Sequence, residues 1–403
     1  MDLGFGSASR CAADGGETEG SPDETGIVRR AAVGCDVVDP VAALKHALGD
    51  VPFAAVILFI CPKAAAEHLL QHAMEAFAPS EVLGCTTAGE ITGNGYAEGH
   101  IVAVGLPQSH FRARSLLVED LENIDAASLI PTMIRNRNDM GADPVARDWS
   151  GEFTFLMIDG LSTREDALTA ELAVGLGPVP LFGGSAGDGD NFRQTRILAK
   201  GAVHTNAAVL LQVRTSCGVK VFKTDHLVPT DRRMVVTGAN PARRTVHELN
   251  AEPAAREYAR ILGKDPEQLT TFTFAAHPVV VKVGGQHHVR AIQRVAENGD
   301  LVFFSAIDEG LVLTLAEPMN MVEHLDTELK GLSKHAKPDT ILACDCILRR
   351  LEAEEKQMTG AISRLLAQHR VVGFSTYGEQ LNSMHVNQTL TGVALYPPEE
   401  EPH

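Results

Sequence analysis

Three turns of small residues, each ending in a carboxylate, are the parts of this sequence best suited to hold a ligand. They are Gly84-Cys85-Thr86-Thr87-Ala88-Gly89-Glu90, Gly183-Gly184-Ser185-Ala186-Gly187-Asp188 and Gly373-Phe374-Ser375-Thr376-Tyr377-Gly378-Glu379. Small residues after a strand let backbone amides approach an anion or a flat ligand closely. None of the turns matches a phosphate-binding or dinucleotide-binding pattern. A tight turn between strands at a domain seam is therefore an equal alternative to a ligand cradle.

Three histidines are candidates for binding a metal. If the segment around His385 is a strand, His385, Asn387 and Thr389 share one face. A neutral imidazole there could bind a metal, while Asn387 or Thr389 fixes its tautomer. His277 and His226 are the other two candidates. For each of them, a hydrogen-bonded structural histidine is the simpler interpretation.

Other reactive residue types give weaker signals. Cys85 could be a nucleophile, but a buried thiol is inert unless its thiolate is stabilised. Ser185 lies outside a G-x-S-x-G pattern, and no base is indicated by spacing. We therefore expect no enzyme, with a cysteine- or serine-dependent hydrolase or transferase as an alternative. Cys61-Pro62 is a dipeptide found at some thiolate-bound haems, and Arg349-Arg350 could hold a carboxylate or propionate. A helix start and a surface pair explain these two dipeptides more simply.

Charge and composition exclude several classes of function. The 403 residues carry a formal net charge of −17, which argues against non-specific nucleic-acid binding because phosphate contacts need clustered Lys and Arg. The seven cysteines include no C-x-x-C pair, which argues against a disulfide framework or a zinc ribbon. The sequence has no apolar run long enough for a membrane span and no signal peptide core. We therefore expect a cytoplasmic protein.

Each turn closes a repeated unit of strand, helix and second strand. The units begin with apolar strands at 54–60, 153–158 and 341–344, and Ser162 with Glu165 predicts a capping box for the second helix. Between the second and third units, alternating residues predict further strands, among them 272–274 and 279–283, around a helix near 253–262. The predicted class is α+β (mixed α/β), with two related domains of layered helices on mixed sheets.

We expect four segments along the chain. Residues 1–27 are predicted to be disordered because Gly, Ser, Asp and Glu dominate them. Residues 28–217 form an N-terminal domain with two units. Residues 218–397 form a C-terminal domain with one unit and the strand-rich insertion, and residues 398–403 are an acidic tail.

The ordered motifs resemble those of the FIST family. Ile158-Asp159-Gly160-Leu161 and the first two turns are similar to the FIST N-terminal domain. Cys344-Asp345-Cys346-Ile347-Leu348-Arg349-Arg350 and the segment from Tyr377 to Thr389 are similar to the FIST C-terminal domain. The resemblance covers roughly residues 28–397. It implies a sensory module for small ligands, amino acids among them, that feeds intracellular signal transduction.

One subset of the family, the stand-alone nitric-oxide-sensing haemoproteins, resembles this chain in layout. That resemblance implies haem bound through a histidine (His385, His277 or His226) and regulation of a partner histidine kinase. The alternative is a sensor of an amino acid or other small metabolite without haem. The candidates for a ligand pocket are Cys85, Thr86, Gly184, Ser185, Arg349, Tyr377, Glu379 and Asn387.

Overall fold

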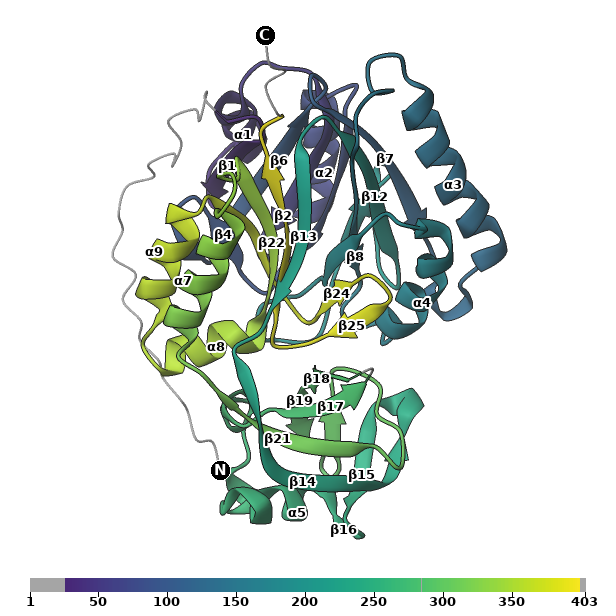
Figure 1. The fold of residues 1–403 in the computed structure, drawn as a ribbon. Coiled ribbons are helices and arrows are strands. Elements are labelled where there is room, and N and C mark those ends of the chain that lie inside the picture. The colour runs from purple at the N-terminus through teal and green to yellow at the C-terminus, as the bar shows by residue number, and fades with distance from the viewer. Residues whose placement is uncertain (1–25, 284, 399–403) are drawn as a thin grey trace.

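The computed structural model describes residues 26–283 and 285–398 (Figure 1). The segments expected to be disordered (1–27) and acidic (398–403) fall almost wholly outside these residues. The described chain forms a body of three six-stranded sheets, with an eight-stranded sheet at its lower end in Figure 1. Helices and mixed sheets together confirm the α+β class.

The three sheets of the body share one strand order, which agrees with the three repeated units predicted from the sequence. The first sheet runs β1 (Arg29–Gly34), β6 (His100–Pro107), β2 (Phe53–Ile60), β3 (Glu81–Thr86), β10 (Ile197–Ala199) and β11 (Ala202–His204). The second runs β7 (Phe111–Val118), β12 (Ala208–Thr215), β8 (Gly151–Ile158), β9 (Leu181–Ser185), β24 (Glu379–Leu381) and β25 (Met384–Val386). The third runs β13 (Gly218–Thr224), β26 (Leu390–Tyr396), β22 (Thr340–Cys346), β23 (Val371–Thr376), β4 (Glu90–Thr92) and β5 (Gly95–Ala97).

The hairpins at one edge of these sheets are exchanged between units in a cycle. The hairpin after the first turn, β4–β5, pairs with β23 of the third unit. The hairpin after the third turn, β24–β25, pairs with β9 of the second unit. The strands after the second turn, β10–β11, pair with β3 of the first unit. Each sheet is thus completed by another unit, and the three turns are brought to one place.

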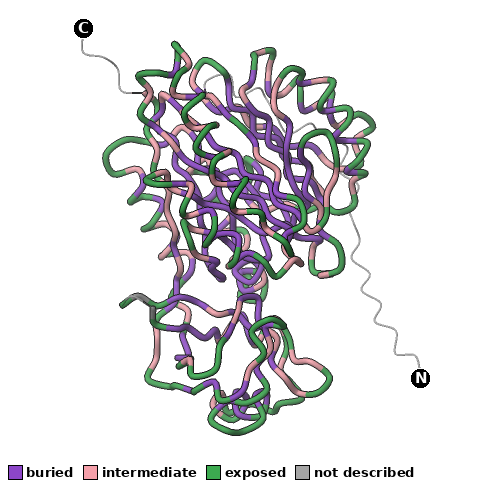
Figure 2. The backbone as a smooth tube through the Cα atoms, turned by 90° about the vertical axis from the view of Figure 1, so that its right-hand side faces the viewer, coloured by how far each residue is buried: buried purple, intermediate pink, exposed green. Residues whose placement is uncertain are grey.

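An aromatic core joins the inner faces of the three sheets. Phe59 of β2 stacks on Phe374 of β23 with ring centroids 4.6 Å apart. It meets Phe155 of β8 edge-on at 6.2 Å. Such ring pairs add to the stabilisation from burying their apolar area. Figure 2 shows the buried backbone concentrated in the sheets of the body and the exposed residues around it.

Helices cover the outer faces of the sheets and bury one apolar side each. The helices of the body are α1 (Pro40–Leu48) and α2 (Ala66–Ala76) on the first sheet, α3 (Ala126–Ala142) and α4 (Glu165–Leu176) on the second, and α7 (Met321–Leu332) and α9 (Thr359–Gln368) on the third. The short helix α8 (Ile347–Glu355) lies between the body and the eight-stranded sheet (Figure 1). Within the described residues, no helix combines the length and apolar character needed to cross a membrane.

Residues 227–318 form the eight-stranded sheet. We call it the inserted sheet because it interrupts the third unit after its first strand, β13, whereas the sequence predicted it between the second and third units. Its strands run β18 (Gln286–Arg290), β17 (Val279–Val283), β21 (Val312–Pro318), β14 (Leu227–Asn240), β15 (Thr245–Leu249), β20 (Leu301–Phe303) and β19 (Ile292–Val295), and β16 (Glu252–Pro253) pairs with β15. Tyr258 of α5 (Ala254–Leu262) and Phe274 of α6 (Thr271–Ala276) pack into its own apolar core.

Two local predictions were wrong. Residues 272–274 belong to α6 and not to a strand, because Thr270 caps that helix by accepting a hydrogen bond from the backbone of Thr273. Ser162 and Glu165 do not form a capping box. The Ser162 hydroxyl donates to the carbonyl of Asp159, while Glu165 pairs with an arginine of the inserted sheet. Glu165 therefore forms an ion pair with Arg244 of the inserted sheet instead of a capping hydrogen bond at the start of α4.

Candidate functional site

The three turns are joined to one another by backbone hydrogen bonds. These bonds run from Ala88 N to Ser375 O (2.9 Å), Ser375 N to Gly89 O (2.7 Å), Ser185 N to Gly378 O (2.8 Å), Tyr377 N to Ser185 O (3.1 Å) and Gly187 N to Thr86 O (3.0 Å). Each turn bonds to both of the others, which satisfies backbone groups that would otherwise be buried without partners. The turns are thus the junction of the three units.

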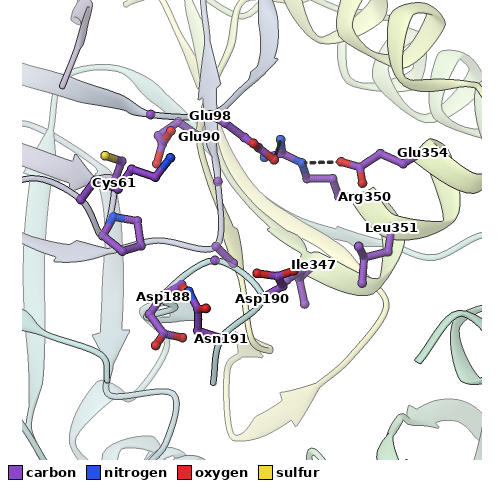
Figure 3. Close-up of a pocket in the computed structure, with 16 residues that line it drawn as sticks. Cys61, Glu90, Glu98, Asp188, Asp190, Asn191, Ile347, Arg350, Leu351 and Glu354 are labelled. Carbon is purple, nitrogen blue, oxygen red and sulfur yellow. Dashed lines mark hydrogen bonds and ion pairs between the residues drawn. The ribbon is translucent and has the colours of Figure 1, made fainter. Parts of the chain in front are cut away.

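A cavity of about 300 Å³ opens beside this junction (Figure 3). Its lining comes from the loop after β2 (61–63), the first turn (88–90), the loop before β6 (98–99), the segment that ends and follows the second turn (188–191), and Ile347, Arg350, Leu351 and Glu354 of α8. All three units therefore contribute to one cavity.

Arg350 is fixed in place on the α8 side of this cavity. Its side chain forms ion pairs with Glu98 at 2.9 Å and with Glu354 at 3.1 Å, the second of which Figure 3 marks. It also donates to the carbonyl of Ala97 at 3.0 Å. A Cβ at Gly89 would lie 1.8 Å from a guanidinium nitrogen of Arg350, and the φ of Gly89 is +132°, so a side chain there would displace Arg350 and strain the backbone. The guanidinium is therefore part of the wall.

Tyr377 of the third turn holds the segment that follows the second turn. Its hydroxyl accepts the N–H groups of Asp188 at 3.0 Å and Phe192 at 3.2 Å, and donates to the Asp188 carboxylate. Its ring stacks on Phe192 with centroids 4.3 Å apart. Burial raises the pKa of Tyr377, so the hydroxyl keeps its proton. One tyrosine thus sets the position of cavity residues 188–191.

Two charged side chains of the lining remain without a partner among the described residues. Lys63 lies in the loop after β2 of the first unit, and Asp190 follows the turn of the second unit. Both side chains are exposed to solvent and form no ion pair within the described chain. The cavity therefore offers one free cation and one free anion, each from a different unit.

The carboxylates that end the first and third turns have matching environments. Glu90 accepts a hydrogen bond from Thr87, and Glu379 accepts one from Thr376, three residues earlier in each case. Thr389 donates to Glu379 through its hydroxyl at 2.7 Å and its N–H at 3.2 Å. Burial raises the pKa of both carboxyls, and that of Glu379 to about 8. The hydrogen bonds of both carboxyls hold the turns, and Glu90 is the one of the two that lines the cavity.

A series of buried polar groups connects α8 to the inserted sheet. Arg349 donates to Asp345 at 2.7 Å and to His226 Nδ1 at 2.9 Å. The other ring nitrogen of His226 lies 2.9 Å from Glu352 of α8. His226 directly precedes β14, and its carbonyl accepts the N–H of Met319, which directly follows β21, at 2.7 Å. The same helix that lines the cavity therefore contacts one connection to the inserted sheet directly, at His226, and the other through the His226 carbonyl.

Comparison with family models identifies this architecture. The model of the FIST N domain matches residues 54–252, and that of the FIST C domain matches residues 254–382. The chain belongs to the FIST family. FIST domains are small-ligand sensing domains of signal transduction, which is consistent with a cavity at the junction of the units. No curated protein matches this FIST chain.

The eight expected pocket residues of the FIST protein lie behind the cavity, and none of them lines it. They are Cys85, Thr86, Gly184, Ser185, Arg349, Tyr377, Glu379 and Asn387. A Cβ at Gly184 would lie 2.5 Å from Thr376 Cγ2, so this glycine permits close packing of the turns. Cys85 is in the aromatic core, where burial raises the pKa of its thiol, so its thiolate is disfavoured. The structure gives no support to Cys85 as a nucleophile.

His385 is buried, and a side-chain amide lies against each of its ring nitrogens. The amide nitrogen of Gln380 lies 3.3 Å from Nδ1, and it also donates to the hydroxyl of Ser185 and the carbonyl of Gly378. Both ring nitrogens therefore lie against protein groups, whereas a ligating histidine needs one nitrogen open to the iron while the other donates a hydrogen bond. Nε2 faces Asn387 at 3.5 Å, and a Cβ on Gly378 would lie 2.9 Å from it. His385 does not fit haem.

The other two histidines differ from each other. Both ring nitrogens of His226 are engaged, by Arg349 and Glu352, so His226 does not fit haem either. His277 ends α6, and no hydrogen bond within the described chain occupies its ring. Burial lowers the pKa of His277 and favours its neutral form. It is not part of the cavity lining.

Cys61 does line the cavity, but burial and Cys35 raise the pKa of its thiol to about 12, which opposes thiolate ligation.

Proposed function

We propose that this FIST protein is a cytoplasmic sensor that binds a small zwitterion, such as an amino acid, in the cavity at the three turns. The observation that carries the proposal is the pair of unpartnered charges, Lys63 and Asp190, in a cavity of about 300 Å³. Lys63 would bind the carboxylate of the ligand and Asp190 its ammonium group, in charge-assisted hydrogen bonds. Ile347 and Leu351 would contact an apolar side chain of the ligand.

Binding would be transmitted through α8. A ligand can shift a conformational equilibrium only if it binds two states with different affinity. A ligand that contacts Leu351 or Arg350 acts on the helix whose other residues, Arg349 and Glu352, hold His226. His226 in turn holds the two connections of the inserted sheet. The inserted sheet is therefore the part that would signal to an output partner, which we propose, on the family resemblance, to be a histidine kinase.

Binding of a panel of amino acids to the purified protein tests this proposal. We expect at least one to raise the melting temperature, since a ligand at 100 times its Kd adds about 2.7 kcal/mol. Lys63→Met and Asp190→Asn should each weaken that ligand about 10- to 100-fold in calorimetric titration, the cost of about 1.5–3 kcal/mol for a hydrogen bond to a charged group. Lys334→Met and Asp139→Asn remove exposed charges elsewhere and should leave affinity unchanged. If no amino acid binds, or if both cavity variants bind as the wild type does, the proposal fails.

Haem-based nitric oxide sensing is the second candidate, and the unoccupied ring of His277 is the observation in its favour. When bound, haem would supply an iron centre for nitric oxide. We expect reconstitution with haem to give no Soret band that depends on this histidine. The contrary result is a Soret band that moves on addition of nitric oxide, is lost in His277→Ala and is kept in His287→Ala. It would favour haem-based sensing over the zwitterion proposal.

A further inference from the structure

We infer that the inserted sheet carries an oxyanion-binding site at Arg290, separate from the cavity at the turns. Arg290 ends β18, a strand that packs against β25 of the body. Its Nε is buried without a hydrogen-bond partner, and no carboxylate of the described residues lies within 4.0 Å of its guanidinium. The side chain donates a hydrogen bond from Nη1 to the carbonyl of Val289 at 3.3 Å. Arg290 as a whole is partly buried, but a buried guanidinium nitrogen without a partner is costly unless an anion pairs with it.

A second unpaired donor lies beside Arg290. Ile292 pairs with Phe303, and the N–H of Phe304 donates to the carbonyl of Ala291 at 3.0 Å, so the antiparallel ladder continues one step. We infer that the next residue, Ser305, which lies in a bend beyond the last paired residue of β20, is across from Arg290 on the same face. The hydroxyl of Ser305 is fully buried and has no partner among the described residues. Arg290 and Ser305 together provide the donors that a carboxylate or phosphate requires.

The acidic residues nearby do not neutralise Arg290, because they gather at another arginine. Arg244 forms an ion pair with Glu165 of α4 at 2.5 Å and lies 3.8 Å from Asp166. Asp166 and Asp308 are close enough to act on Arg290 but are beyond ion-pair distance. Two carboxylates thus share Arg244 while Arg290 has none. An oxyanion at Arg290 would lie near α4 and must bind against the charge of Asp166.

This charge arrangement predicts opposite effects on phosphate binding when Arg290 and Asp166 are each neutralised. At constant pH and ionic strength, sodium phosphate should raise the melting temperature of the wild-type protein, and Arg290→Gln should abolish the effect. Ser305→Ala should weaken binding about tenfold, whereas Asp166→Asn should tighten it by removing a repulsive charge. Arg294→Gln, an exposed arginine of the neighbouring strand, should bind phosphate as the wild type does. Acetate and malonate in place of phosphate distinguish a carboxylate ligand from a phosphorylated one.

Three results would overturn the inference. The first is a wild-type response to phosphate no larger than that to sodium chloride. The second is an equal response in Arg290→Gln. The third is a loss of stability in Asp166→Asn as large as that in Arg290→Gln, without tighter phosphate binding, because Asp166 would then be the internal partner of Arg290. None of these results bears on Lys63 and Asp190, so the site and the proposed sensor can fail independently.

Discussion

Replacing Arg349 with methionine is expected to lower the free energy of unfolding by about 3–5 kcal/mol, the range for removing one partner of a buried ion pair. Arg349 and Asp345 are each 1% exposed and bonded at 2.7 Å. Methionine keeps most of the packing volume, but it leaves the Asp345 carboxylate buried with Tyr96 as its remaining partner and removes the donor to His226. Denaturant unfolding monitored by circular dichroism measures the loss.

The chain supplies a matched control for this substitution. Lys330 and Asp326 form an ion pair of the same i,i+4 spacing on α7, with side chains 63% and 32% exposed. Lys330→Met should cost no more than about 0.5 kcal/mol, because solvent screens such pairs. Adding Asp345→Asn to Arg349→Met should recover part of the loss, since it removes the orphaned charge. A cost for Arg349→Met similar to that for Lys330→Met would show that the pair does not hold α8 in place.

Glu379→Gln should change how stability depends on pH. Burial raises the pKa of Glu379 from 4.5 to about 8, so the folded state holds a proton that the unfolded state releases. The stabilisation is complete below pH 4.5 and is lost as the pH rises to about 8, with a total on the order of 5 kcal/mol at 1.36 kcal/mol per pKa unit. Glutamine has no proton to lose, so the variant should lack this slope.

The readout for Glu379→Gln is the difference in unfolding free energy between variant and wild type from pH 4.5 to 9. Taking this difference cancels the contribution of every other titrating group. As the pH rises, the variant should become more stable relative to the wild type. Glu81→Gln, at a partly exposed carboxylate paired with Lys200, is the control and should show no such trend. A constant difference between Glu379→Gln and wild type would mean that Glu379 is already ionised in the folded protein.

Much of the body could be predicted from the sequence, because its signals are local. The apolar run at 54–60 became β2, and the helical spacing of Ala66, Leu69, Leu70 and Ala73 became the buried side of α2. Such periodicities show whether a segment is a strand or a helix and which side is buried. They do not show which sheet a strand will join. The three repeated units were visible in the sequence, but the exchange of hairpins between them appears only in the structure.

The cavity lining was missed for a related reason. Lys63 and Asp190 are solvent-exposed loop residues whose importance comes from lying in one cavity, and no spacing in the chain relates them. The available signals were partial: Asp188 ends the second turn, and Arg350 belongs to the arginine pair after Cys346. His385 failed as a predicted ligand for the opposite reason. Its neighbours Gln380 and Asn387 were visible in the sequence, but their close packing around both ring nitrogens was not.

The cyclic exchange of hairpins also constrains how this protein can be made. During synthesis, the first sheet stays incomplete until β10 is made, and the second until β24 is made. The third cannot form until the C-terminal unit leaves the ribosome. The contact between Tyr96 and Ser363 alone spans 267 residues. Pairing across such distances is slow, and sheet edges left open meanwhile can pair with other chains. Synthesis of the first two units should therefore be the stage at which this protein most needs a chaperone, and after it the three sheets close together.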